Sequence, residues 1–363
     1  MKVCTITCHN AVNHGARLQA CALLYYLKSL GHDAEVVDYR PEYMSFSDKV
    51  WYWPGVSVKM WAKLFLQLQL RIDSVRRHAA FERFSERYIP RTEQIYRTLG
   101  ELQKNSPQAD AYIAGSDQIW NTSFRTGTDV AYYLDFGAPE TRRVSYAASF
   151  AFPSLVAGCE SFVKKHLSAF DHLSVREKSG LKILASMGCE GEVTVDPVFL
   201  LAAEAWDELL GCCDDMEAYI LVYDVMGREN TIRQIAKRLA KIYGCKIYSV
   251  SSRRLGYADK CFPQAAPDKF VELVRNARCV ISNSFHGTAF ALIYHREFFV
   301  VDRKDGLNER MHDLLCQFGL QSRLVDVNTS DCVLNERISY EDVDKLLYRQ
   351  IAESKTFLRE VLS

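Results

Sequence analysis

The sequence predicts an α/β protein built from two facing, doubly wound domains. Three observations lead to this prediction: strand-like and helix-like segments alternate in two blocks, a break separates the blocks, and the chain has 363 residues. At about 150 residues per domain, this length suits two domains with their own cores. Alternating strands and helices are typical of parallel sheets covered by helices. We therefore expect an N-terminal domain over 1–205 and a C-terminal domain over 206–363, joined around 198–217.

The first block opens with a strand, a helix and a second strand, which together form the seed of a parallel sheet. The apolar run 2–8 predicts a buried strand, 16–31 an amphipathic helix ending at Gly31, and 33–39 another strand. The remaining elements expected in this block are strands at 110–117, 142–150, 172–177 and 191–197, and short helices at 164–170 and 180–188.

The second block repeats the alternation from Tyr219 onward. We expect strands at 219–225, 245–252, 278–282 and 297–302, and helices at 230–244, 268–277 and 288–295. Helical segments then fill the tail to Ser363, and the last helix is predicted to pack back on the first domain.

Residues 45–100 interrupt the first block with an aromatic and then basic stretch that we predict to be a helical insertion. One interpretation is a helix packed by its apolar stripe, with a solvated charged face. The other is a peripheral membrane contact to anionic head groups or a lipid-linked substrate, which Trp51, Trp53 and Trp61 favour.

Composition excludes several classes of protein. Lys+Arg and Asp+Glu both number 45, so no global field favours nucleic acid. Twelve cysteines without repeated spacing indicate neither a metal site nor a disulfide framework. The N-terminal stretch turns polar too early for a secretory signal, and no uncharged apolar run is long enough to form a transmembrane segment. We expect a cytoplasmic protein.

Polar side chains follow the carboxyl ends of four predicted strands, where open parallel sheets bind ligands. In the first turn, 9–19, Gly15 permits close backbone approach, and Asn13, His14 and Arg17 lie beside a helix start that attracts anions. An ordinary helix start would explain the same residues.

The second turn, 115–121, has two equally weighted interpretations. Ser116 or Asp117 could simply cap a helix. The alternative is a sugar site, in which polar groups bind hydroxyls and an indole stacks on the apolar face of the ring. The residues concerned are Ser116, Asp117, Gln118, Trp120 and Asn121.

The third and fourth turns carry an arginine and a histidine. Arg176 emerges from a strand and could fork onto a carboxylate or phosphate, or pair with Glu177. His286 lies between a buried strand and a buried helix expected to begin at Thr288, where it can titrate near neutral pH. A structural histidine bonded to a carbonyl is the alternative, but His286 is the best catalytic candidate in the chain.

Taken together, these turns resemble the polysaccharide pyruvyl transferase family. The matching stretches are NHGARLQA (13–20), YIAGSDQIWN (112–121), VSYAASF (144–150), LSVRE (173–177), VDPVFLL (195–201), ISNSFHGTAF (281–290) and RMHDLLCQFGL (310–320). The resemblance implies two facing Rossmann-like domains of glycosyltransferase-B type, with the acceptor on the N-terminal side and the donor on the C-terminal side. It also implies phosphoenolpyruvate as donor, a sugar acceptor that becomes a cyclic pyruvate ketal, and no cofactor. Whether that acceptor is lipid-linked stays open.

The resemblance implies roles for individual residues. His286 would be the general acid, and Asp117 would orient or deprotonate the acceptor hydroxyl. The predicted donor-binding residues are Arg176, Ser284, Phe285, Gly287, Thr288, Arg303 and Arg310. The predicted acceptor-binding residues are Asn13, His14, Gly15, Arg17, Ser116, Gln118, Trp120 and Asn121.

One position departs from the family pattern. Characterised members carry an arginine two residues before this histidine, where this chain has Ser284. Anion binding must then come from elsewhere, with Arg303, Lys304 and Arg310 as candidates, or the donor differs. Two other functions stay open: a glycosyltransferase in which His286 neutralises the diphosphate of a nucleotide sugar, and a non-catalytic sugar-binding relative.

Overall fold

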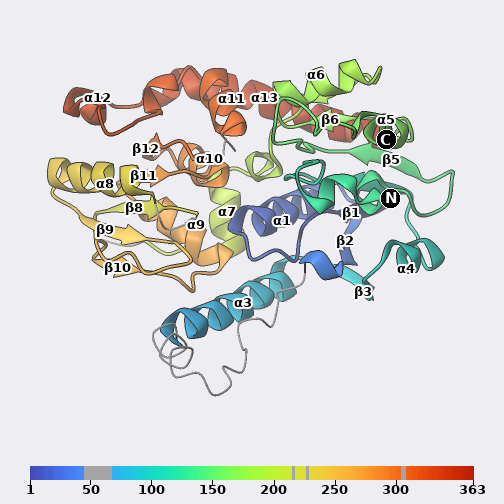
Figure 1. Cartoon of the computed structure of the whole chain (residues 1–363), viewed down its shortest axis with the longest axis horizontal. Helices are drawn as coiled ribbons and strands as arrows, with labels where there is room; N and C mark the ends of the chain where they lie inside the picture. Colours follow the sequence, from blue (N-terminus) through green and yellow to red (C-terminus); the bar gives the residue numbers. More distant parts are fainter. Residues whose placement is uncertain (45–67, 215–216, 226–228, 304–307) are drawn as a thin grey trace.

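Parallel pairing organises the strands into two separate five-stranded sheets (Figure 1). The computed structural model describes residues 1–44, 68–214, 217–225, 229–303 and 308–363. The first sheet contains β1 (Lys2–Ile6), β2 (Asp33–Tyr39), β3 (Arg91–Tyr96), β4 (Ala111–Ala114) and β5 (Arg142–Ser145), in the order β3-β2-β1-β4-β5. The second contains β8 (Tyr219–Tyr223), β9 (Lys246–Ser249), β10 (Lys260–Cys261), β11 (Cys279–Ser282) and β12 (Glu297–Val300), in the order β10-β9-β8-β11-β12. Two parallel α/β sheets confirm the predicted fold class.

Helices connect the strands in both halves. In the first half these are α1 (His14–Ser29), α3 (Leu68–Tyr88), α4 (Leu99–Lys104), α5 (Glu160–Leu167) and α6 (Lys178–Ser186). In the second half they are α7 (Ala203–Leu210), α8 (Asn230–Tyr243), α9 (Pro267–Asn276), α10 (Phe285–Ile293), α11 (Glu309–Gln317), α12 (Asp331–Asn335) and α13 (Tyr340–Val361). Short pieces complete the set: β6 (Ser174–Val175) pairs with β7 (Glu192–Val193), and 3-10 turns occur at η1 (Glu42–Met44), η3 (Arg125–Thr128), η4 (Val130–Tyr133), η5 (Pro197–Leu200) and η6 (Gln321–Arg323).

The predicted helical insertion at 45–100 needs a correction. Within the described residues, α3 is helical as expected, but 91–96 form the edge strand β3, paired with β2. Pro90 explains the change, because proline disfavours helical backbone in the residue before it. The polar residues of β3 suit an edge strand. Residues 45–67, with Trp51, Trp53 and Trp61, lie outside the described part, so the membrane contact stays a prediction.

Several helices begin earlier than the sequence predicts, and two of these starts, in α1 and α10, affect predicted site residues. α1 starts at His14, where the Asn13 side chain accepts a hydrogen bond from the Ala16 N–H at 3.2 Å. α10 starts at Phe285, so His286 lies in the first turn of a helix and not in a loop.

Two long helices join the halves, one along the bottom and one along the top of the view in Figure 1. Asp73 of α3 pairs with Arg254 of the second half at 3.0 Å, while Glu82 of the same helix pairs with Arg17 of α1 at 2.7 Å. Near its end, α13 returns to the first half, where Ser354 accepts a hydrogen bond from the Val195 N–H.

One apolar cluster runs through both halves. It contains Val3 and Ile113 of the first sheet and Leu221 and Val280 of the second, all fully buried. The boundary at 205/206 stays a prediction, because this shared core spans it. Within the described residues, no helix is long and apolar enough to cross a membrane.

Candidate active site

The site is built where β4, β6, β7 and β11 end. Asp117 follows β4, Arg176 follows β6, Asp196 follows β7, and His286 follows β11. Carboxyl ends of parallel strands are the usual ligand-binding edge of an open sheet. Four chain segments far apart in sequence thus bring their charged side chains together.

Asp196 is the centre of the cluster. Its Oδ2 binds Nη1 of Arg176, accepts a hydrogen bond from Oγ of Ser116 at 3.1 Å, and lies 3.5 Å from Nε2 of His286. Its Oδ1 accepts from the Val198 N–H and so starts η5. One buried carboxylate therefore orients an arginine from the first half and faces the histidine of the second.

Charge balance explains how Asp196 stays ionised while buried. Burial alone would raise the pKa of Asp196, but the nearby charges of His286 and Arg176 lower it below its usual value. At neutral pH the carboxylate is therefore an anion, and it faces the imidazole of His286 at 3.5 Å.

The ring of Phe285 packs against the guanidinium of Arg176. The guanidinium lies over the Phe285 ring at 4.5 Å from its centroid, and the same ring meets His286 edge-on at 5.2 Å. Cation–π contact of this kind holds a guanidinium plane in place without using its N–H donors.

Asp117 lies between two arginines. Its Oδ1 is 3.8 Å from Nη2 of Arg176 and 3.7 Å from Nη1 of Arg310. Its backbone has φ of 76°, an uncommon left-handed conformation for a residue other than glycine. Hydrogen bonds from the Ile119 and Ser149 N–H groups to its carbonyl hold this conformation. Such strain often occurs at functional sites.

Within the part of the chain that the structure describes, several buried donors in this cluster have no hydrogen-bond partner. They are Nε and Nη2 of Arg176, Nε of Arg310 and Nε2 of His286. Nη2 of Arg176 lies 3.8 Å from Asp117, Nε of Arg176 lies 3.9 Å from Glu177, and Nε2 of His286 lies 3.5 Å from Asp196. These distances suit ion pairs but are too long for good hydrogen bonds. Because buried donors are normally satisfied, these atoms indicate a site for an anion.

Arg310 supplies positive charge from α11. Burial and the neighbouring Arg176 lower the pKa of Arg310 to about 10, which is still far above neutral pH. Its guanidinium therefore remains charged beside Arg176, and two adjacent buried cations favour an anionic ligand.

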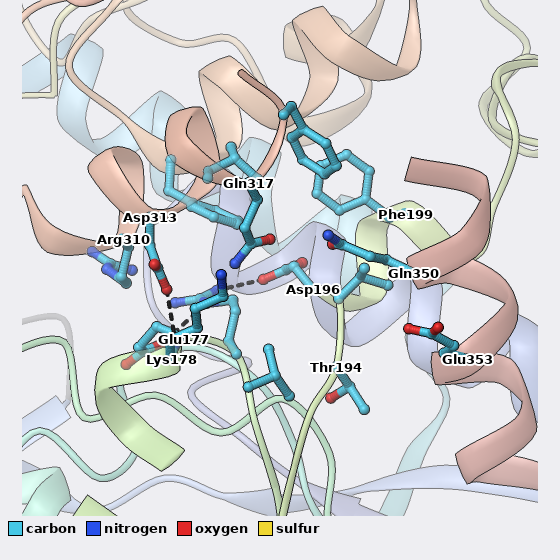
Figure 2. A pocket seen from close by; sticks show the side chains of 16 residues that line it. Glu177, Lys178, Thr194, Asp196, Phe199, Arg310, Asp313, Gln317, Gln350 and Glu353 are labelled. Atoms are coloured by element: carbon cyan, nitrogen blue, oxygen red, sulfur yellow. Dashed lines mark hydrogen bonds and ion pairs between the residues drawn. The ribbon is translucent and has the colours of Figure 1, made fainter. Parts of the chain in front are cut away.

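A cavity of about 170 Å³ opens beside the cluster between the two halves. Figure 2 shows Asp196 between Arg310 and Gln317 of α11 on one side and Gln350 of α13 on the other. Arg176, Lys178 and the rings of Phe199 and Phe285 also line it. Its wall therefore combines cations with apolar surface.

The other predicted donor-side residues have different positions. Ser284 is the residue before the first turn of α10, and Thr288 bonds back to its carbonyl at 3.3 Å. Gly287 packs on Ser282 and Tyr223, where a Cβ would collide, so its role here is helix packing. Arg303 holds Asn308 through its backbone N–H and carbonyl. Lys304 lies outside the described residues. Arg310 joins the cluster, and the nearby charge of Arg303 helps to lower the pKa of Arg310.

Three predicted acceptor residues are corrected because the structure buries them with their polar groups engaged. The ring nitrogens of His14 contact Tyr223 Oη and the Ala265 carbonyl. Arg17 donates to carbonyls and to Glu82 and has no exposed surface. Trp120 is fully buried, stacked on Tyr133, so no sugar can reach its face.

The remaining acceptor-side residues have mixed roles. Asn121 is fully buried and binds Gln118 and the Ser123 N–H. Asn13 caps α1, and Gly15 lies against His286. Ser116 belongs to the Asp196 cluster and Gln118 lines a second cavity, described below.

Asp196 was missed in the search for reactive residues. The available signal was its position near the end of the predicted strand 191–197, directly before Pro197, at the same sheet edge as the four polar turns. Groups of three or more His, Cys, Asp or Glu side chains placed to hold a metal do not occur in the described ranges.

The chain is similar to known proteins in both sequence and structure. A family model described as polysaccharide pyruvyl transferase matches residues 13–305. The UDP-N-acetylglucosamine 2-epimerase from Rickettsia bellii is 14% identical with a TM-score of 0.51, over 100% of this chain and 96% of that chain. The glycosyltransferase SnogD from Streptomyces nogalater is 13% identical with a TM-score of 0.49, over 100% of both chains. No curated protein matches significantly. The first structural match confirms a glycosyltransferase-B-like fold and shows nothing further.

Proposed function

Because the chain belongs to the polysaccharide pyruvyl transferase family, we propose that it transfers pyruvate from phosphoenolpyruvate to a sugar of a cell-surface polysaccharide precursor. The product is a cyclic pyruvate ketal, and phosphate is released. The observation that carries the proposal is the group of buried, unpaired donors of Arg176 and Arg310 beside His286. It supports a small dianionic donor held next to an acid.

In this proposal the donor binds in the cavity lined by Arg176 and Arg310. Phosphoenolpyruvate carries a carboxylate and a phosphate, and planar guanidinium groups bind both through paired hydrogen bonds. Arg310 takes the place of the family arginine that Ser284 replaces. Phe199 and Phe285 would contact the apolar methylene end.

His286 then donates a proton to the methylene carbon. Nδ1 packs against Gly15, whereas Nε2 has no hydrogen-bond partner and lies 3.5 Å from Asp196 of the cavity wall, so Nε2 is the nitrogen that would exchange a proton with the ligand. Protonation makes the central carbon cationic, and a positioned acid typically contributes about 10²–10⁴-fold to such a step. Asp196 stabilises the charged imidazole, as a carboxylate orients histidine in other proton-transfer sites.

The acceptor sugar completes the reaction with two hydroxyls. The first oxygen bonds to the cationic carbon, and Asp117 accepts its proton. The carbon–oxygen bond to phosphate then breaks, with Arg176 and Arg310 stabilising the departing charge. The second hydroxyl closes the ketal, and its proton leaves with the phosphate group. The methyl group has then gained a proton from His286 and phosphate one from the second hydroxyl, while Asp117 holds the proton of the first hydroxyl; proton exchange with water returns Asp117 and His286 to their starting states.

A coupled assay tests this function. The protein is incubated with phosphoenolpyruvate and a panel of nucleotide-linked and lipid-linked sugars, and released phosphate is compared with the mass gain of each acceptor. We expect equal amounts of phosphate and ketal product with at least one acceptor. Release of nucleoside diphosphate with phosphoenolpyruvate unchanged would instead identify a glycosyltransferase.

A further inference from the structure

A second cavity, of about 410 Å³, borders the opposite side of Asp117. It is lined by Cys8, Ala11, Tyr43, Met44, Asp117, Gln118, Phe124, Arg125 and Thr126. Asp117 therefore belongs to both regions: its carboxylate faces Arg176 and Arg310, and the residue also lines this second cavity. A ligand in this cavity and a donor bound by Arg176 and Arg310 would therefore both lie next to Asp117.

Aromatic and apolar side chains form much of the wall, and they are held in place. The Tyr43 hydroxyl donates to Asp129 at 2.6 Å, and Met44 Sδ accepts from the Tyr132 hydroxyl at 3.2 Å. Phe124 is 51% exposed, which is unusual for a large apolar side chain. Fixed apolar faces with a few polar groups are typical of small-molecule sites.

Arg125 adds a positive charge at this cavity. Its guanidinium lies over the Tyr43 ring at 4.8 Å, and among the described residues it forms no ion pair. Stacking orders the guanidinium while its N–H donors stay available, the arrangement in which arginine binds phosphate in two-point fashion.

We propose that this second cavity binds the acceptor as a glycosyl phosphate. The sugar ring packs on Tyr43 and Phe124, a hydroxyl faces Asp117, and the phosphate on the anomeric carbon binds Arg125. This inference rests on the proposed pyruvyl transfer only in assigning the bound sugar the role of acceptor. Binding of the sugar itself needs no phosphoenolpyruvate. Free glycosyl phosphates and sugars on a polyprenyl diphosphate share the recognised group.

Calorimetric titration without phosphoenolpyruvate tests the site directly. The probes are glucose, galactose, mannose and N-acetylglucosamine, each as the methyl glycoside and as the 1-phosphate. We expect at least one 1-phosphate to bind more tightly than its methyl glycoside, and Arg125→Gln to weaken that binding about tenfold. The methyl glycoside should be unaffected by Arg125→Gln, whereas Phe124→Ala should weaken both.

Arg87→Gln is the matched control, because Arg87 is also exposed and stacks on a tyrosine, Tyr88, at 5.0 Å. The inference is overturned if Arg87→Gln and Arg125→Gln weaken binding of the 1-phosphate equally. It is also overturned if no sugar 1-phosphate binds more tightly than its methyl glycoside. Tighter binding of glucuronic acid than of any 1-phosphate overturns it as well. A vesicle arm carrying the same sugar on polyprenyl diphosphate identifies the source of the phosphate. Because phosphate release from phosphoenolpyruvate is measured separately, failure here leaves the pyruvyl-transfer proposal intact, and the reverse also holds.

Discussion

Gly15 of α1 lies directly against the imidazole of His286 in α10. A Cβ on Gly15 would overlap the Nδ1 of that ring. The two helices follow β1 and β11, which belong to different sheets. Because Gly15 has no side chain, α1 of the first half can pack directly against His286 of the second half.

Replacing Gly15 should displace His286. In Gly15→Ala, the new methyl group forces the imidazole away from Asp196, and a displacement near 1 Å can reduce catalysis about 100-fold. The measurement is kcat for phosphate release, with the melting temperature recorded for the same protein. Gly100→Ala in α4 is the control, because a Cβ there meets no atom within 4 Å. Unchanged kcat in a folded Gly15→Ala protein would refute the contact's importance.

His286→Gln should remove the proton donor. We expect kcat to fall by about 10²–10⁴-fold, while the thermal shift given by phosphoenolpyruvate persists because Arg176 and Arg310 remain. His295→Gln provides the comparison, since the His295 side chain is 46% exposed and pairs with Asp344 at the surface. Activity at the wild-type rate in His286→Gln would eliminate the acid role.

Asp196→Asn should alter the pH dependence of kcat/KM. Without its carboxylate the protonated imidazole loses a stabilising anion, so the alkaline fall in kcat/KM should begin at lower pH. Asp302→Asn is matched to it, because Asp302 also pairs with a histidine, His312, but at the surface and at 2.7 Å. A kcat/KM profile that keeps its alkaline limb in Asp196→Asn would mean that Asp196 serves structure alone.

Because of the buried His14, the free energy of unfolding should decrease in mild acid. Burial, with a smaller effect from Arg77, holds the pKa of His14 well below the ordinary 6.5. The unfolded chain then binds a proton that the folded chain does not, so stability is fully present above about pH 6.5 and falls below it. The free energy of unfolding should drop by at most about 1.4 kcal/mol per pH unit from this group. Urea titrations between pH 8 and 5 should show that the free energy of unfolding depends less steeply on pH in His14→Gln than in the wild type. The same pH dependence in both proteins would contradict this expectation.

The order of most elements was predictable because buried parallel strands are continuous apolar runs, as in β4 and β8. β3 was not predictable in the same way, since its residues are polar and only its pairing with β2 makes it a strand. The start of α10 was placed too late, because Phe285 and His286 carry no local signal of a helix.

The positions of Arg176 and His286 at strand ends were predictable, because a single charged or titratable residue after an apolar run is enough to indicate such a position. Asp196 could not be assigned a role, because its partners Arg176 and His286 reach it only through the fold. Trp120 shows the opposite error. An indole after a strand suits either a sugar or a core, and only packing against Tyr133 and Phe150 decides for the core.

Proton transfer to the donor is the central claim, and deuterium incorporation tests it most directly. The reaction is run in D₂O with phosphoenolpyruvate and the acceptor identified by the coupled assay, and the methyl group of the ketal is analysed by NMR and mass spectrometry. Addition of a solvent-derived proton to the methylene carbon predicts a single deuterium in that methyl group, with one phosphate released per ketal formed. A product that lacks deuterium, or an acceptor modified without consumption of phosphoenolpyruvate, would contradict the account.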